Sequence, residues 1–300
     1  MESAAYSPAH VTGLVQAYEY PDDPINTGSK GIGFSIQGGV TTHAKATPST
    51  SSEIYIDING RPAADAPVSE HVAKTFIAKT GRNHKVFIKH KVDTPIGVGF
   101  GTSGAAALSL ALALNDALEL GLSRIEAAQV AHLAEVACRT GLGTVLAEMQ
   151  GGFEARVKPG APGFGRVVAI PVTGDYVMGA LVLGPLSTGG MLREIRRKEE
   201  AAALGERLLD LFLADRSVES FLNLSNRFSQ VLGLSPRLQG ILKEARDAGF
   251  VCGVALFGET VFTLIKPSEV EDLKQIFMKH TVNGSSILVS RMEDRGARLL

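Results

Sequence analysis

A run of alternating glycines constrains this chain more than any other feature of its sequence. The segment from Pro95 to Ala107 reads Pro-Ile-Gly-Val-Gly-Phe-Gly-Thr-Ser-Gly-Ala-Ala-Ala. Glycines at every second position let a backbone approach an anion closely and turn its N–H groups toward it. A stretch rich in alanine and leucine follows and predicts a helix from about Thr102 to Leu120, whose free N–H groups and dipole would point at the same anion.

The segment is therefore a candidate phosphate-binding loop, with hydroxyl groups available for a phosphate oxygen or Mg²⁺. Its candidate nucleotide-binding residues are Gly97, Gly99, Gly101, Thr102, Ser103 and Gly104. The pattern also fits a tight turn from a strand into a helix that binds no ligand. The Gly-Lys-Ser/Thr ending of the P-loop is absent.

Length and composition restrict the class of protein. The chain has 300 residues, 45% of them hydrophobic, which predicts two closely joined domains with a sizeable core. The net charge of −1 provides no excess for sequence-independent nucleic-acid binding, and two cysteines exclude a disulfide framework. The longest apolar run, Ala105 to Leu114, is about half of the ~20 residues that a membrane span needs. We therefore expect a soluble, cytoplasmic protein that binds neither nucleic acid nor a membrane.

The hydrophobic pattern mixes strands with helices and predicts an α+β fold. Predicted strands cover residues 11–20, 31–39, 40–46, 54–58, 86–92, 153–157, 166–171, 176–183, 251–256, 260–265 and 286–289, with a turn at Gly38-Gly39 between the second and third. Predicted helices cover residues 67–79, 102–120, 123–139, 144–150, 190–213, 218–232, 236–248 and 268–279. The segment Lys158–Gly165 is crowded with proline and glycine and is the predicted linker, which divides the chain into 1–163 and 164–300.

Three motifs in this order resemble the GHMP kinase superfamily. The glycine loop is similar to the phosphate loop of that superfamily. Ser-Pro-Ala-His-Val-Thr-Gly at residues 7–13 is similar to its N-terminal motif, and Gly-Val-Ala-Leu-Phe-Gly at residues 253–258 to its C-terminal glycine motif. The resemblance implies a two-domain fold, with an N-terminal ribosomal S5 domain 2-like half and a C-terminal ferredoxin-like α/β sandwich, and a cleft between the halves that holds ATP and an acceptor.

Within the superfamily, further details resemble the archaeal pantoate kinases. These details are Gly-Ser-Lys-Gly-Ile-Gly at residues 28–33, Ala-His-Leu-Ala-Glu-Val at 131–136, Thr-Gly-Leu-Gly at 140–143 and Gly-Gly-Phe at 151–153. The resemblance implies phosphorylation of (R)-pantoate by ATP to 4-phosphopantoate, in archaeal coenzyme A synthesis, with Mg²⁺ as the metal.

The resemblance also implies roles for single residues. Ser103 and Glu135 correspond to the hydroxyl and carboxylate that bind Mg²⁺ in the family, although a carboxylate at 135 also fits a solvated helix face. The positions that correspond to pantoate contacts are Ser29, His132, Arg156 and Thr188. The fork of an arginine suits a carboxylate such as that of pantoate. Without a ligand, His132 also fits a buried or surface histidine, Arg156 a surface strand arginine, and the other two positions plain turns.

His10 and Thr144 complete the predicted catalytic residues, together with Ser103 and Glu135. His10 stands where many superfamily members have Lys or Arg, and Thr144 stands where pantoate kinases have an Asp that meets the substrate hydroxyl. A threonine cannot act as a base at neutral pH. Three explanations are open: the reaction needs no carboxylate base, Glu148 one helical turn later reaches the site, or the protein binds its ligands without catalysis.

Two other functions therefore stay open beside pantoate phosphorylation. One is a different GHMP small-molecule kinase acting on homoserine, mevalonate or a sugar, and the other is a non-catalytic binding protein. A leucine-rich cluster at residues 208–213 is expected in the core or at the surface of a homodimer.

Overall fold

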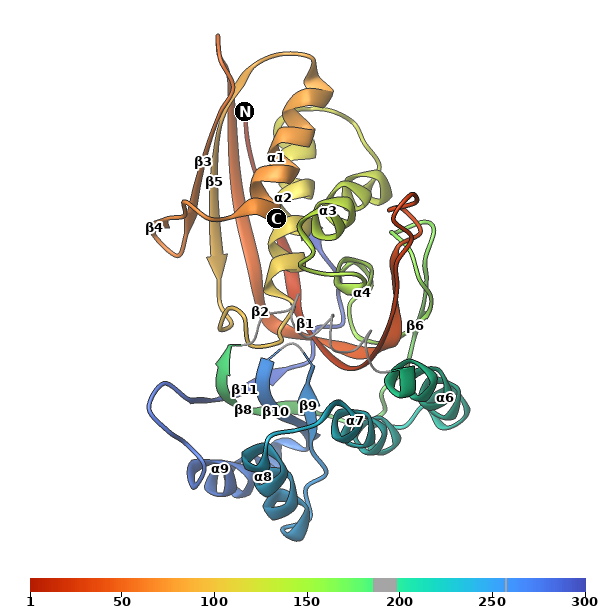
Figure 1. The fold of residues 1–300 in the computed structure, drawn as a ribbon. Helices are drawn as coiled ribbons and strands as arrows, with labels where there is room; N and C mark the ends of the chain where they lie inside the picture. The colour runs from red at the N-terminus through yellow and green to blue at the C-terminus, as the bar shows by residue number, and fades with distance from the viewer. Residues whose placement is uncertain (186–198, 257) are drawn as a thin grey trace.

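The computed structural model describes residues 1–185, 199–256 and 258–300. Figure 1 shows two stacked parts, a long curved sheet covered by helices α1 to α4 and a smaller sheet with α8 and α9 on its far side. Thr188 lies outside the described residues, as does the first part of the helix predicted over 190–213.

Among the described residues, the first part contains a sheet of eight strands and four helices. Its strands are β1 (Glu2–Tyr18), β2 (Gly28–Pro48), β3 (Glu53–Ile58), β4 (Arg61–Pro62), β5 (His84–Val92), β6 (Phe153–Lys158), β7 (Arg166–Ala169) and β12 (Arg298–Leu299). They run in the order β12-β1-β2-β5-β3-β4, while β6 pairs with both β2 and β7. Its helices are α1 (Pro67–Thr80), α2 (Thr102–Ala117), α3 (Arg124–Cys138) and α4 (Thr144–Gln150).

The second part is an antiparallel sheet of four strands in the order β11-β8-β10-β9, as far as the described residues extend. Its strands are β8 (Val177–Pro185), β9 (Gly253–Ala255), β10 (Gly258–Ile265) and β11 (Ser286–Arg291). The helices in this half of the chain are α6 (Glu199–Asp215), α7 (Val218–Leu232), α8 (Pro236–Asp247) and α9 (Val270–Met278), the last preceded by a 3₁₀ turn at Pro267–Glu269. None of the described helices has the length and apolar character needed to cross a membrane.

Two predictions about the first sheet were wrong. The first strand begins at Glu2 rather than Val11, and β2 continues through Gly38-Gly39 without a turn. A Cβ on Gly39 would lie 2.0 Å from the carbonyl oxygen of Ser7, where the pairing of β1 with β2 shifts by a bulge. Glycine is therefore needed at residue 39 because two backbones approach closely there.

The predicted linker also has a different position. Lys158 at the end of β6 pairs with Arg166 in β7, so the proline- and glycine-rich segment connects two strands of the first sheet. The first sheet thus includes β7 and β12 from beyond residue 163. The division of the chain at 163/164 stays a prediction.

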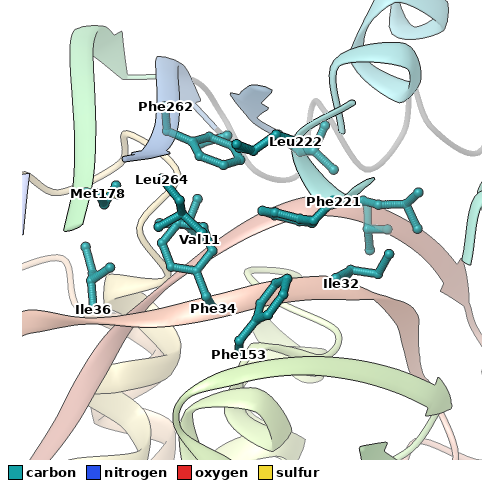
Figure 2. Close-up of a cluster of buried hydrophobic side chains, with 14 of the residues drawn as sticks. Val11, Ile32, Phe34, Ile36, Phe153, Met178, Phe221, Leu222, Phe262 and Leu264 are labelled. Carbon is teal, nitrogen blue, oxygen red and sulfur yellow. The ribbon is translucent and has the colours of Figure 1, made fainter. Parts of the chain in front are cut away.

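A shared aromatic core joins the two parts, as Figure 2 shows. The ring of Phe221 from α7 lies 5.9 Å from Phe34 of β2, 5.1 Å from Phe153 of β6 and 5.9 Å from Phe262 of β10, measured between centroids. All four rings are almost completely buried, so the two sheets cannot separate without exposing them to water. Most of the leucine-rich cluster of α6 also belongs to the core, whereas Leu211 is exposed.

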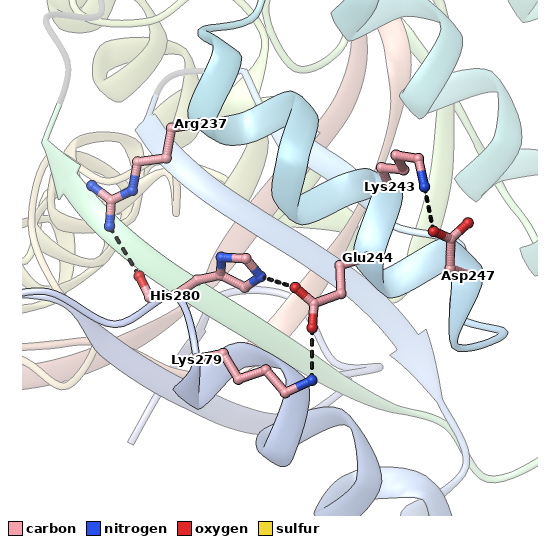
Figure 3. A network of polar contacts seen from close by, with 6 residues as sticks. All are labelled: Arg237, Lys243, Glu244, Asp247, Lys279 and His280. Carbon is pink, nitrogen blue, oxygen red and sulfur yellow. Dashed lines mark hydrogen bonds and ion pairs between the residues drawn. The ribbon is translucent and has the colours of Figure 1, made fainter.

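The outer helices of the second part are linked by polar contacts. Figure 3 shows Glu244 of α8 accepting hydrogen bonds from Lys279 over 2.7 Å and from His280 over 2.8 Å, just beyond α9. Ion pairs at an exposed surface contribute little to stability. The packing of α8 and α9 therefore depends on the apolar cluster beneath them, which includes Leu242 and Phe277.

Candidate active site

A cavity of about 150 Å³ lies where the glycine loop faces β1, β2 and the segment before α4. It brings together ten of the residues predicted from the sequence: Ser29, Gly97, Gly99, Gly101, Thr102, Ser103, Gly104, Glu135, Thr144 and Arg156. Two other predicted residues, His10 and His132, lie behind its wall and do not line it.

The glycine loop has the backbone conformation that its sequence predicted. Gly97, Gly99 and Gly101 have φ values of 78°, 94° and 64°, in the left-handed region that favours glycine. Gly101 is the N-cap of α2 and offers no side chain to the first N–H groups of that helix. These N–H groups lack partners within the helix and remain available to an anion at the loop.

Strand β10, from the second half of the chain, packs directly against this loop. A Cβ on Gly258 would lie 2.0 Å from the carbonyl oxygen of Val98, and the hydroxyl of Thr260 donates to the same oxygen over 2.8 Å. The C-terminal glycine motif therefore lets β10 approach the loop and support it from the far side.

Ser103 and Glu135 form a pair at one end of the cavity, on α2 and α3. The hydroxyl groups of Ser103 and Thr140 both donate to Oε1 of Glu135, over 2.5 and 2.7 Å. Glu135 is 2% exposed; burial raises the pKa of its carboxyl group, and the two hydrogen bonds oppose that shift. Thr140 belongs to the Thr-Gly-Leu-Gly motif of the sequence, but no role was predicted for it.

This pair suits Mg²⁺ by its chemistry. Mg²⁺ takes one or two oxygen ligands from a protein and completes its octahedron with phosphates and water. The described residues contain no cluster of three or more His, Cys, Asp or Glu side chains that would suit a different, fully protein-ligated metal. A hydroxyl and a carboxylate beside a phosphate loop therefore fit a metal that arrives with a nucleotide.

Arg156 also lines the cavity and is held by a buried carboxylate that sequence reasoning missed. Its Nη1 donates to Oε1 of Glu154 over 2.5 Å, and the same oxygen lies 3.0 Å from Nε2 of His10. All three side chains are at most 1% exposed. Glu154 and Arg156 are alternate residues of β6 and share one face, the only sequence indication of this contact.

The guanidinium of Arg156 also has a nitrogen that makes no hydrogen bond in the described part of the chain. Its Nε is buried and has no hydrogen-bond partner among the described residues. A Cβ on Gly143 would lie 2.1 Å from the hydroxyl oxygen of Ser29 and 3.2 Å from this Nε, so both atoms lie beside Gly143, which also lines the cavity. Two donors beside a glycine form a suitable place for a carboxylate.

His132 supports the wall of the cavity from behind. Its ring lies 2.9 Å from the carbonyl oxygen of Thr27, two residues before Ser29, and burial lowers the pKa of His132 to about 4. A neutral ring that donates to this carbonyl orders the chain leading to Ser29. The pantoate contact expected of His132 stays a prediction.

Glu148 does not reach the cavity. Its carboxyl group is fully buried under the loop, where a Cβ on Gly101 would lie 2.7 Å from Oε1 and one on Gly104 2.9 Å from Oε2. Neither oxygen has a hydrogen-bond partner among the described residues. Burial raises the pKa of Glu148 well above its usual value, and the negative charge of Glu135 adds to that shift.

A second, more apolar pocket of about 210 Å³ adjoins the same loop. Its wall includes Pro67, Val68 and Val92, and it shares Thr102 and Ser103 with the first cavity. A ligand with phosphates at the loop could therefore extend an apolar group into this pocket.

Comparisons with known proteins identify relatives of this chain. The model of the family described as GHMP kinases N terminal domain matches residues 68–152. Pantoate kinase of Thermococcus kodakarensis is 32% identical over 283 residues, which cover 91% of this chain and 90% of that protein. Pantoate kinase of Methanocaldococcus jannaschii is 32% identical over 90% of this chain and 96% of its own length.

A solved structure described as a phosphotransferase related to the CoA biosynthesis pathway has a TM-score of 0.89 at 28% identity, over 100% of this chain and 99% of its own. The two-part α+β fold expected from the three motifs is thereby confirmed. The chain belongs to the pantoate kinase family, within the GHMP kinases.

Proposed function

We propose that this protein transfers the γ-phosphoryl group of ATP to (R)-pantoate and forms 4-phosphopantoate, in coenzyme A synthesis. The family assignment supports the reaction and makes the protein a small-molecule kinase. The observation that carries the proposal is that one cavity is lined both by the glycine loop and by Ser29 and Arg156, whose Nε lacks a hydrogen-bond partner among the described residues.

The glycine loop would bind the phosphates of ATP. The first N–H groups of α2 supply donors there, and the apolar pocket beside Val68 and Val92 would take the base. Ser103 and Glu135 would hold Mg²⁺, which neutralises negative charge on the phosphates when it is bound. Thr140 keeps the carboxylate of Glu135 pointed at this place through its 2.7 Å hydrogen bond.

The acceptor would bind by its carboxylate. The Nε of Arg156 and the hydroxyl of Ser29 would donate to this group, and Glu154 prevents the guanidinium from turning away. Val15 also lines the cavity and offers an apolar contact to the dimethyl carbon of pantoate. The hydroxyl at the other end of the substrate then lies toward the glycine loop.

No carboxylate other than Glu135 lines this cavity in the described part of the chain. This supports a reaction that depends on positioning and charge neutralisation more than on a general base. General-base catalysis contributes about 10²–10⁴-fold, so an enzyme with threonine at residue 144 would be slower than one with aspartate and still active.

Release of ADP with Mg-ATP tests the proposal, across pantoate, homoserine, mevalonate and galactose. We expect turnover on pantoate only. Turnover on a different acceptor would support a different GHMP kinase and reject pantoate. A thermal shift with ATP or pantoate but no ADP from any acceptor would support the non-catalytic alternative, because binding alone stabilises the folded state. The roles of Thr188, the cytoplasmic location and a homodimer stay predictions.

A further inference from the structure

A chain of buried hydrogen bonds begins and ends at the cavity. Thr12 of β1 lines the cavity, and its hydroxyl oxygen lies 3.2 Å from Nδ1 of His10. The other nitrogen of that ring, Nε2, lies 3.0 Å from Oε1 of Glu154. Arg156, which also lines the cavity, donates to the same oxygen of Glu154.

The chemistry of the groups determines the direction of each hydrogen bond. The guanidinium of Arg156 is always a donor, and the carboxylate of Glu154 accepts. His10 faces this carboxylate with Nε2, so Nε2 carries the hydrogen. Burial is the main influence on His10 and lowers its pKa, so the ring is neutral and Nδ1 has no hydrogen. The hydroxyl of Thr12 must therefore donate to Nδ1.

This direction leaves Thr12 with free lone pairs and no free hydrogen. It can accept a hydrogen bond in the cavity, but it cannot donate one while the bond to His10 lasts. Thr12 lies close to the phosphate loop, because β1 is bound to this loop two residues earlier. There the backbone N–H of His10 donates to the carbonyl oxygen of Phe100 over 3.0 Å. A hydrogen-bond acceptor at this point suits a ligand group that can donate a hydrogen bond beside the loop.

We propose that Thr12 accepts a hydrogen bond from the reacting hydroxyl of the acceptor substrate and so directs a lone pair of that oxygen toward the γ-phosphorus. The inference rests on the proposed phosphoryl transfer to an alcohol. In that step the alcohol oxygen forms a bond to the γ-phosphorus, and the bond from this phosphorus to the bridging oxygen breaks. ADP leaves with the electron pair, and the hydroxyl proton is released to water. Thr12 keeps its own proton throughout.

Thr144 is the competing residue, since it also lines the cavity. Its methyl group is directed at the loop: a Cβ on Gly101 would lie 2.7 Å from Cγ2 of Thr144. Thr144 is the first residue of α4, after the N-cap Gly143, and its hydroxyl makes no hydrogen bond within the described part of the chain. No network therefore sets the direction of its hydrogen, in contrast with Thr12.

The test compares steady-state kinetics of the full-length enzyme and three variants on pantoate. Thr12→Val keeps the shape and removes the acceptor, so we expect kcat to fall about 10- to 100-fold while KM for ATP stays within about twofold. Thr12→Ser restores the hydroxyl and should return kcat to within about threefold of the wild type. The matched control is Thr42→Val, because Thr42 makes a bond of the same kind to Nδ1 of His90 over 2.8 Å but lines none of the described cavities near the loop.

The outcomes separate this inference from the proposed function. A wild type that phosphorylates a different alcohol but not pantoate would reject the substrate, and the same four proteins would then be compared on that alcohol. A wild-type kcat in Thr12→Val would overturn the role of Thr12. A large loss in a further variant, Thr144→Val, with none in Thr12→Val would also overturn it and assign the contact to Thr144.

Discussion

Glu154 and Arg156 lie two residues apart on β6, and the guanidinium of Arg156 donates to the buried carboxylate over 2.5 Å. This contact holds one end of the guanidinium, while its buried Nε lies near Gly143 and Ser29 without a hydrogen-bond partner among the described residues. A cation at the wall of an acceptor site is thereby held by an anion that never touches the cavity.

The first prediction concerns the shape of that cation. Arg156→Lys keeps the charge but loses the fork that reaches Glu154 and the cavity together. We expect kcat/KM for pantoate to fall at least about tenfold, with KM for ATP within about twofold, in steady-state assays. Arg298→Lys is the control, because Arg298 pairs with Glu293 away from the cavity. Equal losses in both variants would contradict a specific role for Arg156.

The second prediction concerns the metal. Glu135→Gln removes the only carboxylate that lines the cavity in the described part of the chain. We expect turnover to fall about 10- to 100-fold at limiting Mg²⁺ and to recover partly as Mg²⁺ is raised. Titration of Mg²⁺ at saturating ATP measures this. Wild-type turnover at limiting Mg²⁺ would show that the metal assignment is wrong.

The third prediction concerns the pH dependence of stability in the protein without nucleotide or metal. Burial raises the pKa of Glu148 well above the usual value of 4.5. The unfolded chain therefore loses this proton at a lower pH than the folded protein, and stability falls as the pH rises from about 4.5 to the folded pKa. The variant Glu148→Gln cannot ionise at this position, so we expect it to melt at a higher temperature than the wild type at pH 8 and at nearly the same temperature at pH 4.

Calorimetry of both proteins between pH 4 and pH 8 measures this difference. Glu70→Gln is the control, since Glu70 is an exposed residue of α1 paired with Lys74. If the Glu148→Gln variant melts below the wild type at pH 8, the carboxylate of Glu148 is charged and stabilising, and the prediction is wrong.

The fourth prediction concerns the glycine loop. Gly101→Ala places a Cβ 2.7 Å from Glu148 and Thr144 at a φ of 64°, so both the packing and the backbone are strained. We expect a loss of about 1–3 kcal/mol in the free energy of unfolding and a large rise in KM for ATP. Gly240→Ala is the opposite case, because α8 leaves open space around it, and a gain of up to about 1 kcal/mol is expected. Denaturant titration measures the free energy of unfolding of both variants. A change of the same sign and size in the two would contradict this prediction.

Features that depend on neighbouring residues were predictable from the sequence. Helix α3 begins at Arg124, after the N-cap Ser123, next to the start predicted at residue 123, and the alternating glycines adopt left-handed conformations before α2. The family resemblance, rather than a local pattern, indicated Ser103 and Glu135 as a pair, and the structure places them in contact. Turn chemistry was less certain, because Gly38-Gly39 fits both a turn and the close approach of two strands.

Features that depend on distant residues were decided by the tertiary structure. The bond from His10 to Glu154 spans 144 positions, and nothing near either residue indicates the other. Such contacts also set the direction of the Thr12 hydroxyl, hold Arg156 against Glu154 and place His132 behind the cavity wall. The sequence by itself thus determined the loop, its helix and the family, because these depend on local backbone chemistry. The tertiary structure decided which polar groups face the cavity, because burial and pairing arise only when β1, β2 and β6 lie side by side.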